Sequence, residues 1–487
     1  MEKITPTGVL KSRIQSLVPK VFLGDLEKAI SYSEEKYKNS YRYNNEPMIN
    51  HTLRIAISLL EEGLDLNTAF ATLFHEMTLD EKTRKEIAKE FGEDVLNILD
   101  GITKIKRGTN SEDTNPEIII KYILNSSKDL RPVYLKIYDT LHDVLSFDEI
   151  PENEKKSKLY KAINIYAKLA EYLNLEKLRA QLEETSFKYY LPLEYQSITN
   201  KMDALGISPK LQKKYENTIK ECIKESNVKP KIQGRIKNKY SIYNKLKKYE
   251  KEWIDPNIRR LDDLIAFRIM ASDEDSCYLV IEKLMDRGEI NEERYDDYIS
   301  NPKPNGYKAV QFPIKFPEIS DMYIEIQILT EEMYQENLFG KASHIAYKAS
   351  KSRFAKPTNK YDWVKDIQDE IAKSREETKR TKSFPIKCNI FEDEVFPFTP
   401  KGKIIPLNQG DTVLDFAFKL HTDIGNSTES AKVNGKPAKL GEVLETGDEV
   451  EIRVDKNKTH QKDATLEYAN SSTARSKIKK NLKIGVK

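Results

Sequence analysis

The chain has 487 residues, of which 33% are charged and 38% hydrophobic, and its formal net charge at pH 7 is +3. This length is too great for one hydrophobic core and indicates about three domains. The net charge is too small to indicate a nucleic-acid partner for the whole molecule. The sequence has no run of about 18 apolar residues that could cross a membrane, and its N-terminus lacks a signal-peptide stretch.

Three cysteines, Cys222, Cys277 and Cys388, lie far apart in the sequence. Their number and spacing provide neither a disulfide framework nor a CxxC zinc motif. This usage is typical of a reducing compartment, so we expect a cytoplasmic protein without a membrane partner.

The first two parts of the sequence differ in the spacing of their apolar residues. From about Leu23 to Leu191 the apolar residues recur at helical spacing, as in TLRIAISLLEEG and KAINIYAKLAEYL, which predicts an all-α domain over residues 1–194. After Tyr195 a basic segment leads into LIAFRIMA, AVQFPIKF and MYIEIQIL, which are typical of strands. We predict a mixed α/β domain over residues 195–372 and a charged linker over 373–386.

Residues 387–455 are predicted to form a small β-rich unit. NIFEDEVFPFTPKGKIIPL is typical of a hairpin that turns at residues 400–402, and Asn434-Gly435 supplies a second turn. Residues 456–487 form a basic tail with nine Lys or Arg against two acids. Such a tail is either an electrostatic handle for RNA or a solvated helix with a frayed end.

Half of the six histidines fall in the helical part, at His51, His75 and His142. Glu76 follows His75, and neighbours on a helix are about 100° apart, so both can lean toward one ion. Asp139 precedes His142 by one turn. Imidazoles and carboxylates from separate helices suit a divalent ion such as Mn²⁺, Mg²⁺ or Zn²⁺. Helical histidines are also common as satisfied core residues, so spacing leaves both interpretations open.

Carboxylates on two predicted strands indicate a second kind of site. Asp263 opens an apolar strand, and Glu325 alternates with isoleucines on another, sharing a face with Gln327. An acid from each of two strands is a usual way to hold Mg²⁺ against nucleotide phosphates. Tyr307 and Gln311 share the polar face of the strand after NPKPNG, where a Tyr can stack on a base. Phosphates could be bound by the nearby cations Arg235, Lys237, Lys239 and Lys245.

Taken in this order, the segments resemble the RelA/SpoT family of alarmone enzymes from about residue 25 to the end. The first part resembles its metal-dependent HD-type hydrolase domain through RYNNEPMINH, LFHEMTLD and KIYDTLHDV. The second resembles its nucleotidyltransferase-like synthetase domain through GRIKNKYSIYNKL, LDDLIAFRIM, YDDYISNPKPNGYKAV and IEIQILT. The third resembles its β-grasp-like TGS domain through FPFTPKGKIIPL, LDFAFKLHTDIG and GDEVEI.

The resemblance implies transfer of a pyrophosphate from ATP to the 3′-hydroxyl of GDP or GTP. It implies that Asp263 and Glu325 hold Mg²⁺ and that Glu325 also acts as a general base. The residues implied to bind ATP are Arg235, Lys237, Ser241 and Lys245. Those implied near the acceptor nucleotide are Asn305, Tyr307, Gln327 and His344, with Tyr307 stacked on guanine.

Two positions depart from the family's synthetase pattern, and one short run is a hybrid of two family forms. Gln311 stands where the family usually has His, and Leu329 stands where it usually has Arg. Losing one bidentate Arg contact costs on the order of 2 kcal/mol of transition-state binding, which weakens synthesis without abolishing it. The run RYDD at residues 294–297 is a hybrid of the bifunctional form RFKD and the synthetase-only form EFDD.

The hydrolase-like part departs more seriously. By resemblance, Arg42 contacts the base, and the ligands of Mn²⁺ or a similar ion are His51, His75, Glu76 and Asp139. The family's usual His-Asp dyad is His-Glu here, and Asp143 replaces a usual Asn. The acidic pair that positions the attacking water reads Leu79-Asp80, and leucine can neither orient water nor accept a proton. We therefore expect impaired hydrolysis.

Three functions remain open from the sequence. The first is a (p)ppGpp synthetase with an impaired hydrolase, and the second is a (p)ppGpp hydrolase with a weakened synthetase. The third is a silent sensor that binds deacylated tRNA or the ribosome through the TGS domain and the basic tail, with His421 as the RNA-contact residue. Long family members continue beyond the TGS domain, so we expect a form truncated after it.

Overall fold

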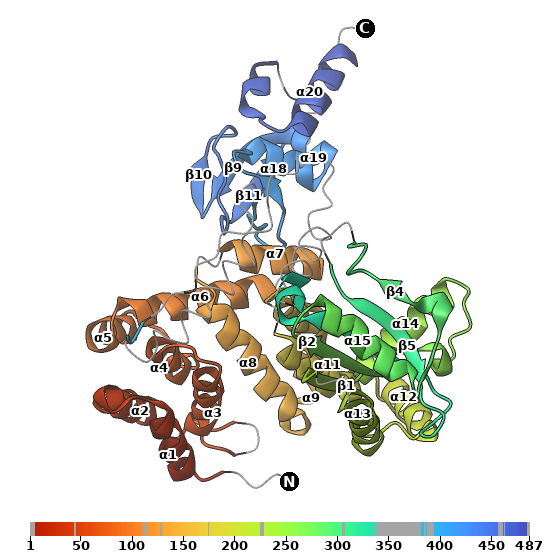
Figure 1. Cartoon of the computed structure of the whole chain (residues 1–487). Coiled ribbons are helices and arrows are strands. Elements are labelled where there is room, and N and C mark those ends of the chain that lie inside the picture. The colour runs from red at the N-terminus through yellow and green to blue at the C-terminus, as the bar shows by residue number, and fades with distance from the viewer. Residues whose placement is uncertain are drawn as a thin grey trace. The chain divides into compact units, whose positions relative to one another are not determined.

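The structure, a computed structural model, describes residues 5–42, 45–110, 114–126, 129–173, 175–224, 228–303, 307–334, 336–337, 381–383, 386, 394–455, 461 and 463–484. The chain forms two compact units, Met1–Ile165 with Asp366–Lys487, and Tyr166–Lys365 (Figure 1). Within the described ranges no helix is long and apolar enough to span a membrane.

The N-terminal part of the first unit is helical in its described residues, which confirms the predicted all-α class. Its apolar stripes meet in one core; on the third helix Leu53, Ile55 and Ala56 are fully buried. The helices are α1 (Thr7–Leu17), α2 (Leu23–Lys36), α3 (Met48–Glu61), α4 (Leu66–Phe74), α5 (Glu81–Phe91), α6 (Glu93–Thr109), α7 (Pro116–Ser126), α8 (Arg131–Leu145) and α9 (Glu152–Lys161).

A buried arginine fixes the starts of three of these helices. Arg131 is 1% exposed, and its guanidinium donates to Asp65 Oδ2 at 2.6 Å, Asp94 Oδ1 at 2.6 Å and Asp129 Oδ2 at 2.7 Å. Asp65 is the N-cap of α4, Asp94 lies in the first turn of α6, and Asp129 precedes α8. Because Arg131 donates to all three carboxylates, it holds the N-termini of α4, α6 and α8 together.

The end of the predicted linker packs on this same cluster. The Lys382 carbonyl accepts the backbone N–H of Asn67, and the Ile386 carbonyl accepts that of Leu130, both at 2.9 Å. These donors are N–H groups at the N-terminal ends of α4 and α8. Such N–H groups have no partner within their own helix. Ser383 Oγ adds a 2.8 Å bond to Asp94. Most of residues 373–386 lies outside the described residues.

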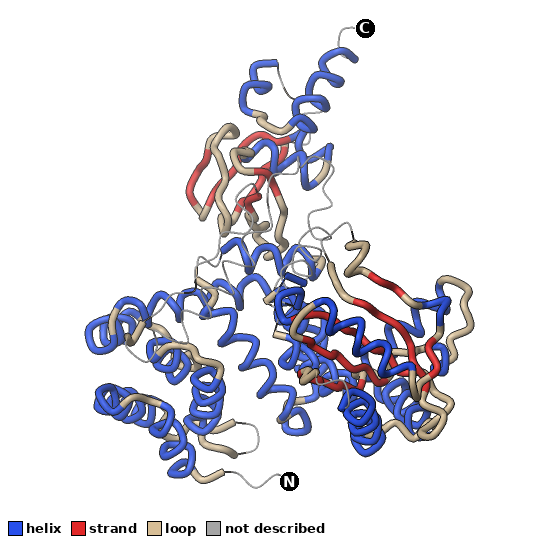
Figure 2. The backbone as a smooth tube through the Cα atoms, in the orientation of Figure 1, coloured by secondary structure: helices blue, strands red, loops and turns tan. Residues whose placement is uncertain are grey.

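The second unit combines helices with a mixed sheet, as predicted for the middle domain (Figure 2). Its compact boundary falls at Tyr166, before the expected start at residue 195. A π-helix (Ala162–Tyr166) precedes it. The helices are α10 (Ala167–Tyr172), α11 (Glu176–Tyr190), α12 (Pro192–Ala204), α13 (Pro209–Ile223), α14 (Lys239–Lys251) and α15 (Glu274–Met285). The strands are β1 (Lys231–Ile236), β2 (Ile265–Ala271), β3 (Glu289–Ile290), β4 (Asp296–Asp297), β5 (Val310–Lys315) and β6 (Ile324–Thr330).

The sheet has the order β1-β2-β6-β5-β3, with β4 paired to β5. The pair β2 and β6 is parallel, and the other described pairs are antiparallel. On β6 the isoleucines are buried while Glu325 and Gln327 are half-buried, which confirms the predicted alternation. In the sheet register, Gln327 lies between Arg268 of β2 and Gln311 of β5. One face of the central strands therefore carries a row of polar side chains.

The C-terminal part of the first unit is a small β-rich structure, as predicted. It contains β7 (Glu394–Val395), β8 (Leu407–Asn408), α18 (Val413–Leu420), α19 (Thr422–Ser427), β9 (Thr428–Val433), β10 (Lys436–Ala438), β11 (Val450–Val454) and α20 (Ser472–Ile484). Strands β7 and β8 form the predicted antiparallel hairpin. Asn434 and Gly435 both have positive φ, 52° and 77°, as the turn between β9 and β10 requires.

The basic tail is ordered over much of its length. Ala474 and Ile478 of α20 are buried in one cluster with Leu414 and Phe418 of α18. The carboxylate of Asp415 accepts the backbone N–H groups of residues 470 and 471, at 2.8 and 3.0 Å. This part of the tail is therefore an amphipathic helix anchored to the β-rich structure, which differs from a helix solvated on every side.

Candidate functional site

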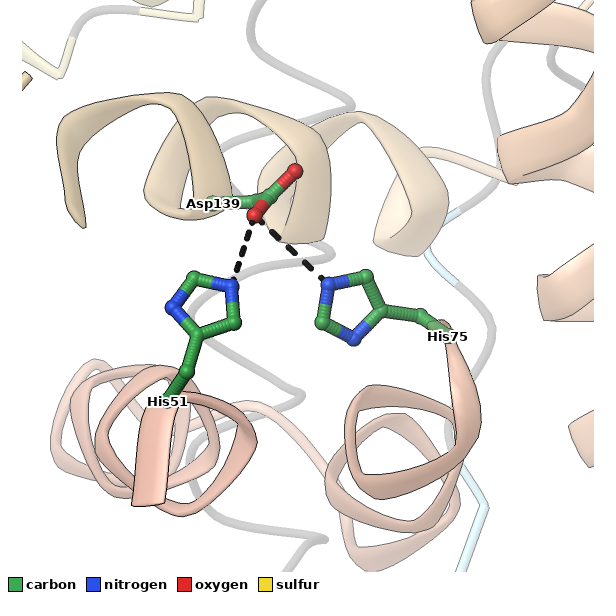
Figure 3. Close-up of side chains that lie close together, drawn as sticks. All are labelled: His51, His75 and Asp139. Atoms are coloured by element: carbon green, nitrogen blue, oxygen red, sulfur yellow. Dashed lines mark hydrogen bonds and ion pairs between the residues drawn. The ribbon is translucent and has the colours of Figure 1, made fainter. Parts of the chain in front are cut away.

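Three helices bring two histidines and an aspartate together (Figure 3). His51 comes from α3, His75 directly follows α4, and Asp139 comes from α8. Asp139 Oδ1 lies 3.1 Å from His51 Nε2 and 3.6 Å from His75 Nε2. One ligand atom from each residue lies within 4.8 Å of the other two, and all three residues are buried. The tertiary fold thus assembles residues that are 88 positions apart.

The orientation of His75 suits a metal ligand. Its Nδ1–H donates to the Thr72 carbonyl at 2.6 Å, so in the neutral ring the lone pair is on Nε2. Nε2 is buried, lies 3.2 Å from Glu76 Oε1, and makes no well-aligned hydrogen bond to a described residue. Burial disfavours the charged ring, but the adjacent carboxylates of Asp139 and Glu76 raise the pKa of His75 to about 9. The cluster therefore favours a positive charge at this point.

The donor set fits a divalent ion. Two imidazole nitrogens and a carboxylate oxygen suit Mn²⁺, Fe²⁺ or Zn²⁺, and Glu76 supplies a further oxygen beside His75. Burial opposes ionisation of Asp139, yet Lys136, His51 and His75 hold its pKa well below the usual value. Glu76 lies in the turn after α4 instead of on the helix itself, because the helix ends at Phe74. His51, His75 and Asp139 would hold the ion, with Glu76 at its edge.

We expect Asp139→Asn to weaken Mn²⁺ binding about 100-fold or more, because the amide has no negative charge. Isothermal titration of the full chain with MnCl₂ measures this. Asp100→Asn, on the exposed Arg84 pair, is the matched control and should bind as the wild type does. If the Asp139→Asn protein binds Mn²⁺ as tightly as the wild type does, the cluster is a set of hydrogen-bonded core residues and not a metal site.

The other residues of the hydrolase-like part have different contacts. Arg42 and Asp143 form an ion pair of 2.7 Å, with side chains only 11% and 14% exposed. His142 is near the cluster, with its ring 6.4 Å from that of His51, and burial lowers its pKa to about 3. Asp80, expected beside the attacking water, caps α5 by accepting the N–H of Thr83 at 2.7 Å through one of its two carboxylate oxygens. This bond satisfies an otherwise unpaired helix donor.

The second unit has a polar cleft of 260 Å³ whose lining includes Asp263, Glu325 and Lys245. Asp263 lies in a turn two residues before β2, and Glu325 is on the neighbouring parallel strand β6. Lys245 Nζ from α14 lies 3.2 Å from Asp263 Oδ1, and Lys237 Nζ forms an ion pair with its other oxygen. The structure thus brings together the two carboxylates and two of the cations singled out in the sequence.

The two carboxylates have opposite electrostatic environments. Burial opposes the charge of Asp263, but Lys237 and Lys245 hold its pKa below the usual value. Burial raises the pKa of Glu325, and the negative charge of Asp263 raises it further. Asp263 is therefore the permanent anion, and Glu325 is the group that takes up a proton more readily.

Tyr307 is less accessible than its position on the polar face predicts. It is 7% exposed, and burial raises its pKa to about 12. Its hydroxyl accepts a 2.6 Å hydrogen bond from Gln311 Nε2 and another from Gln327 Nε2. Gln327 in turn accepts a 2.7 Å bond from Arg268 Nε, so four polar side chains form one network across β2, β6 and β5.

Residue Leu329 was expected on the cleft face beside Glu325 and Gln327. The structure buries it completely, and Met270 is its partner on β2, so this end of the face is apolar. The run RYDD places Arg294 in an ion pair with Asp262, whose pKa is raised by burial. Both residues line the cleft.

Of the remaining expected residues, three are described by the structure and two are not. Arg235 is on β1 opposite Ala266, and the N–H of Ser241 is bonded to Asn238 in the first turn of α14. Asn305 and His344 lie outside the described residues. His421 lies between α18 and α19 with a largely exposed side chain, and its Nδ1 accepts the N–H of Asp423.

Arg268 is a further residue of this network that was not predicted from the sequence. It is the only charged residue in the apolar strand IAFRIMA, and its guanidinium also lies 4.7 Å from the ring centre of Tyr334. A lone Arg in a strand that is otherwise buried needs a partner or a ligand. That pattern, visible in the sequence, could have indicated a site residue.

Comparison with known protein families agrees with this division of the chain. The HD domain family model matches residues 29–175, the region found in RelA / SpoT proteins matches 234–352, and the TGS domain matches 395–454. The fold and the two candidate sites therefore define a protein that joins an HD domain, an α/β synthetase-type domain and a TGS domain.

Several curated relatives match most of the chain. The chain is 31% identical to GTP pyrophosphokinase rsh of Brucella melitensis, over 91% of this chain and 59% of the relative. It is 32% identical to a GTP pyrophosphokinase of Myxococcus xanthus, over 93% of this chain and 60% of the relative. The guanosine-3′,5′-bis(diphosphate) 3′-pyrophosphohydrolase of Aquifex aeolicus is also 32% identical, over 94% of this chain and 64% of the relative. The chain belongs to the RelA/SpoT family.

The chain spans about three fifths of the length of these relatives. Among solved structures, small alarmone synthetase 2 from Bacillus subtilis matches 37% of this chain and 94% of its own, with 24% identity and a TM-score of 0.26. This score is too low to carry an argument about the present site.

Proposed function

We propose that this chain is a (p)ppGpp synthetase, which transfers the pyrophosphate of ATP to the 3′-hydroxyl of GDP or GTP. The observation that carries the proposal is the cleft in which Asp263 and Glu325 meet Lys245. Two relatives that cover most of the chain are GTP pyrophosphokinases, which supports the same reaction. Substrates would be ATP and a guanine nucleotide, and Mg²⁺ would neutralise their phosphates when bound.

In the proposed reaction the 3′-oxygen of the acceptor attacks the β-phosphorus of ATP. The bond from that phosphorus to the α,β-bridging oxygen breaks, and AMP leaves. The hydroxyl proton passes to Glu325, for which its raised pKa is suitable. Lys237 and Lys245, now paired with Asp263, would bind the transferred phosphates together with Arg235, and Ser241 would contribute a hydroxyl from α14.

The acceptor nucleotide would lie toward the other end of the polar row. Gln327 and Tyr307 form the network there, and Asn305 and His344 are proposed as further contacts. Base stacking on Tyr307 requires a change at this side chain, because its ring is almost fully covered. Arg268 would hold Gln327 in place.

A second function is proposed for the helical part, namely metal-dependent removal of the 3′-pyrophosphate of (p)ppGpp. The His51, His75 and Asp139 cluster favours it, and the Aquifex relative is a 3′-pyrophosphohydrolase. We propose that its rate is low, because Leu79 cannot activate water and Asp80 is used as a helix cap. His421 and the α20 region are the proposed contacts for deacylated tRNA or the ribosome.

One nucleotide assay tests these functions. The purified chain is incubated with ATP, GDP and Mg²⁺, and a product with a 3′-pyrophosphate plus an equal amount of AMP is expected. In parallel, ppGpp is supplied with Mn²⁺, and only slow release of pyrophosphate is expected. Rapid release with no synthesis would reverse the two assignments. No reaction in either tube would leave the chain a binding protein.

A further inference from the structure

A groove of 290 Å³ runs between α12 and α14 on the surface of the second unit. Its floor is apolar, because Ile198 of α12 and Leu246 of α14 are both buried there. Tyr243 lines the groove and packs against the same core cluster. Among the described residues, none lines both this groove and the polar cleft of Asp263 and Glu325. The groove is therefore a separate surface feature.

Two large apolar side chains are exposed beside this groove. Leu193, which lines it, is 81% exposed, and Trp253 is 96% exposed. In the sequence Trp253 lies between Glu250 and Pro256, which both line the groove. Aromatic side chains of this kind bury about 150–250 Å² in cores and interfaces. An apolar groove with an exposed leucine and an exposed tryptophan beside it indicates a surface that binds a partner.

The backbone of Trp253 is unusual as well. Its φ is +58° at the C-terminal end of α14, where its N–H donates to the Glu250 carbonyl at 3.3 Å. Glycine is the usual residue with this conformation at a helix end, because a side chain there costs about 1 kcal/mol. An indole that is 96% exposed recovers little of this cost by packing within its own chain.

The charges on α12 identify the partner. Glu194 and Lys201 both line the groove, and their spacing of seven residues, about two turns, places them on one face of the helix. Neither takes part in an ion pair within the described residues, whereas Lys247 and Glu250 of α14 pair with each other at 2.9 Å. An acid and a base on one helix face are complementary to a second, antiparallel copy of that helix. A two-fold axis near Ser197 would form both pairs at once.

We propose that this face of α12 and α14 binds a second copy of the chain in an antiparallel, two-fold arrangement. Glu194 pairs with Lys201 of the partner subunit, and symmetry repeats the pair. Leu193 and Trp253 are covered by the partner. Standard interfaces bury about 800 Å² per partner, and this face is formed by only two helices. We therefore expect a weak dimer, with a dissociation constant on the order of 10 µM.

Sedimentation of the full chain without nucleotides tests the proposal, so the result does not depend on the proposed reaction. Between about 1 and 100 µM the wild type should change from monomer to dimer. Glu194→Lys places lysines opposite each other at both contacts, and Lys201→Glu places glutamates there. Each variant alone should therefore dimerise at least about tenfold less tightly. Glu282→Lys reverses an exposed charge on α15 and is the matched control, which should dimerise as the wild type does.

A mixture of the two charge variants is the sharpest measurement. In the mixed dimer both lysines of the Glu194→Lys protein face both glutamates of the Lys201→Glu protein. The mixture should therefore associate about as tightly as the wild type, although neither component does so alone. The double variant Glu194→Lys/Lys201→Glu restores both pairs within one sequence and should regain the wild-type affinity.

Trp253→Gly separates a role in binding from a role in folding. Glycine adopts the positive φ without strain, so this protein should unfold at the wild-type temperature or above. It should nevertheless dimerise about tenfold less tightly, because the apolar cover is lost. A loss of thermal stability with unchanged association would show that the indole is structural and would overturn its place in the interface.

Three further results would overturn the proposal. A wild type that stays monomeric at every concentration would leave this face to a partner of another kind. Wild-type association by both single charge variants would place the dimer contact on a different surface. Failure of the mixture to associate, with both components folded by circular dichroism, would exclude the antiparallel pairing of Glu194 with Lys201 of the partner subunit.

Discussion

Replacing Glu325 by glutamine is expected to lower the rate of pyrophosphate transfer by about 10³-fold, because the amide cannot accept the proton of the 3′-hydroxyl or bind Mg²⁺. Asp263→Ala and Glu325→Ala should also remove synthesis without unfolding the chain. The measurement is the steady-state rate of AMP formation with ATP, GDP and Mg²⁺. Glu289→Gln, on the edge strand β3 and paired with Lys315, is the control and should keep the wild-type rate.

The same substitution has an expected effect on stability. The pKa of Glu325 is raised in the folded state by burial and by Asp263, so folding favours its protonated form. Its contribution to stability is full below the unfolded pKa of about 4.3 and is lost as the pH rises through the folded value. Glu325→Gln removes this loss, so the variant should unfold at a higher temperature than the wild type at pH 7. Synthesis near the wild-type rate in this protein would refute the assignment of Glu325.

Replacing Arg131 by methionine is expected to destabilise the helical part by about 3–5 kcal/mol, because three carboxylates lose their shared cation. Asp65 and Asp94 are tied to it at 2.6 Å, and Asp65 is fully covered by protein. Chemical denaturation followed by circular dichroism measures the loss. Because His75 directly follows α4 and Asp139 lies on α8, Mn²⁺ affinity should fall in parallel with stability.

Arg84→Met is the matched control for this prediction. Its bidentate pair with Asp100 is more than a third exposed on both sides, and such surface pairs contribute about 0–1 kcal/mol. The pH dependence gives a second check. Burial opposes the charge of Asp94, but Arg131 lowers its pKa, so its stabilisation is present at neutral pH and is lost as the pH falls through the folded value. An Arg131→Met protein that unfolds with the wild-type midpoint would contradict this account of Arg131.

Periodicity in the sequence was sufficient to predict the fold class of each domain. The 3.6-residue pattern before residue 191 and the period-two pattern around Glu325 are local properties of the chain, and the structure confirms both. The turn at Asn434 and Gly435 was predictable for the same reason, because positive φ is a property of those residue types. Residue types and spacing singled out His51, His75, Asp139, Asp263 and Glu325, and the family resemblance gave these residues their roles.

Other features depended on contacts between distant segments. The sequence could not show that Asp80 is used as a helix cap, that Leu329 is buried, or that Tyr307 is covered by Gln311 and Gln327. Nor could it show that Asp143 pairs with Arg42, which precedes α3, and with Lys158 of α9. Local pattern decides which elements form, since backbone and side-chain periodicity act within a few residues. Packing decides which charges meet. Only the folded core brings them within a few ångströms of each other, in an interior where water does not screen the charges.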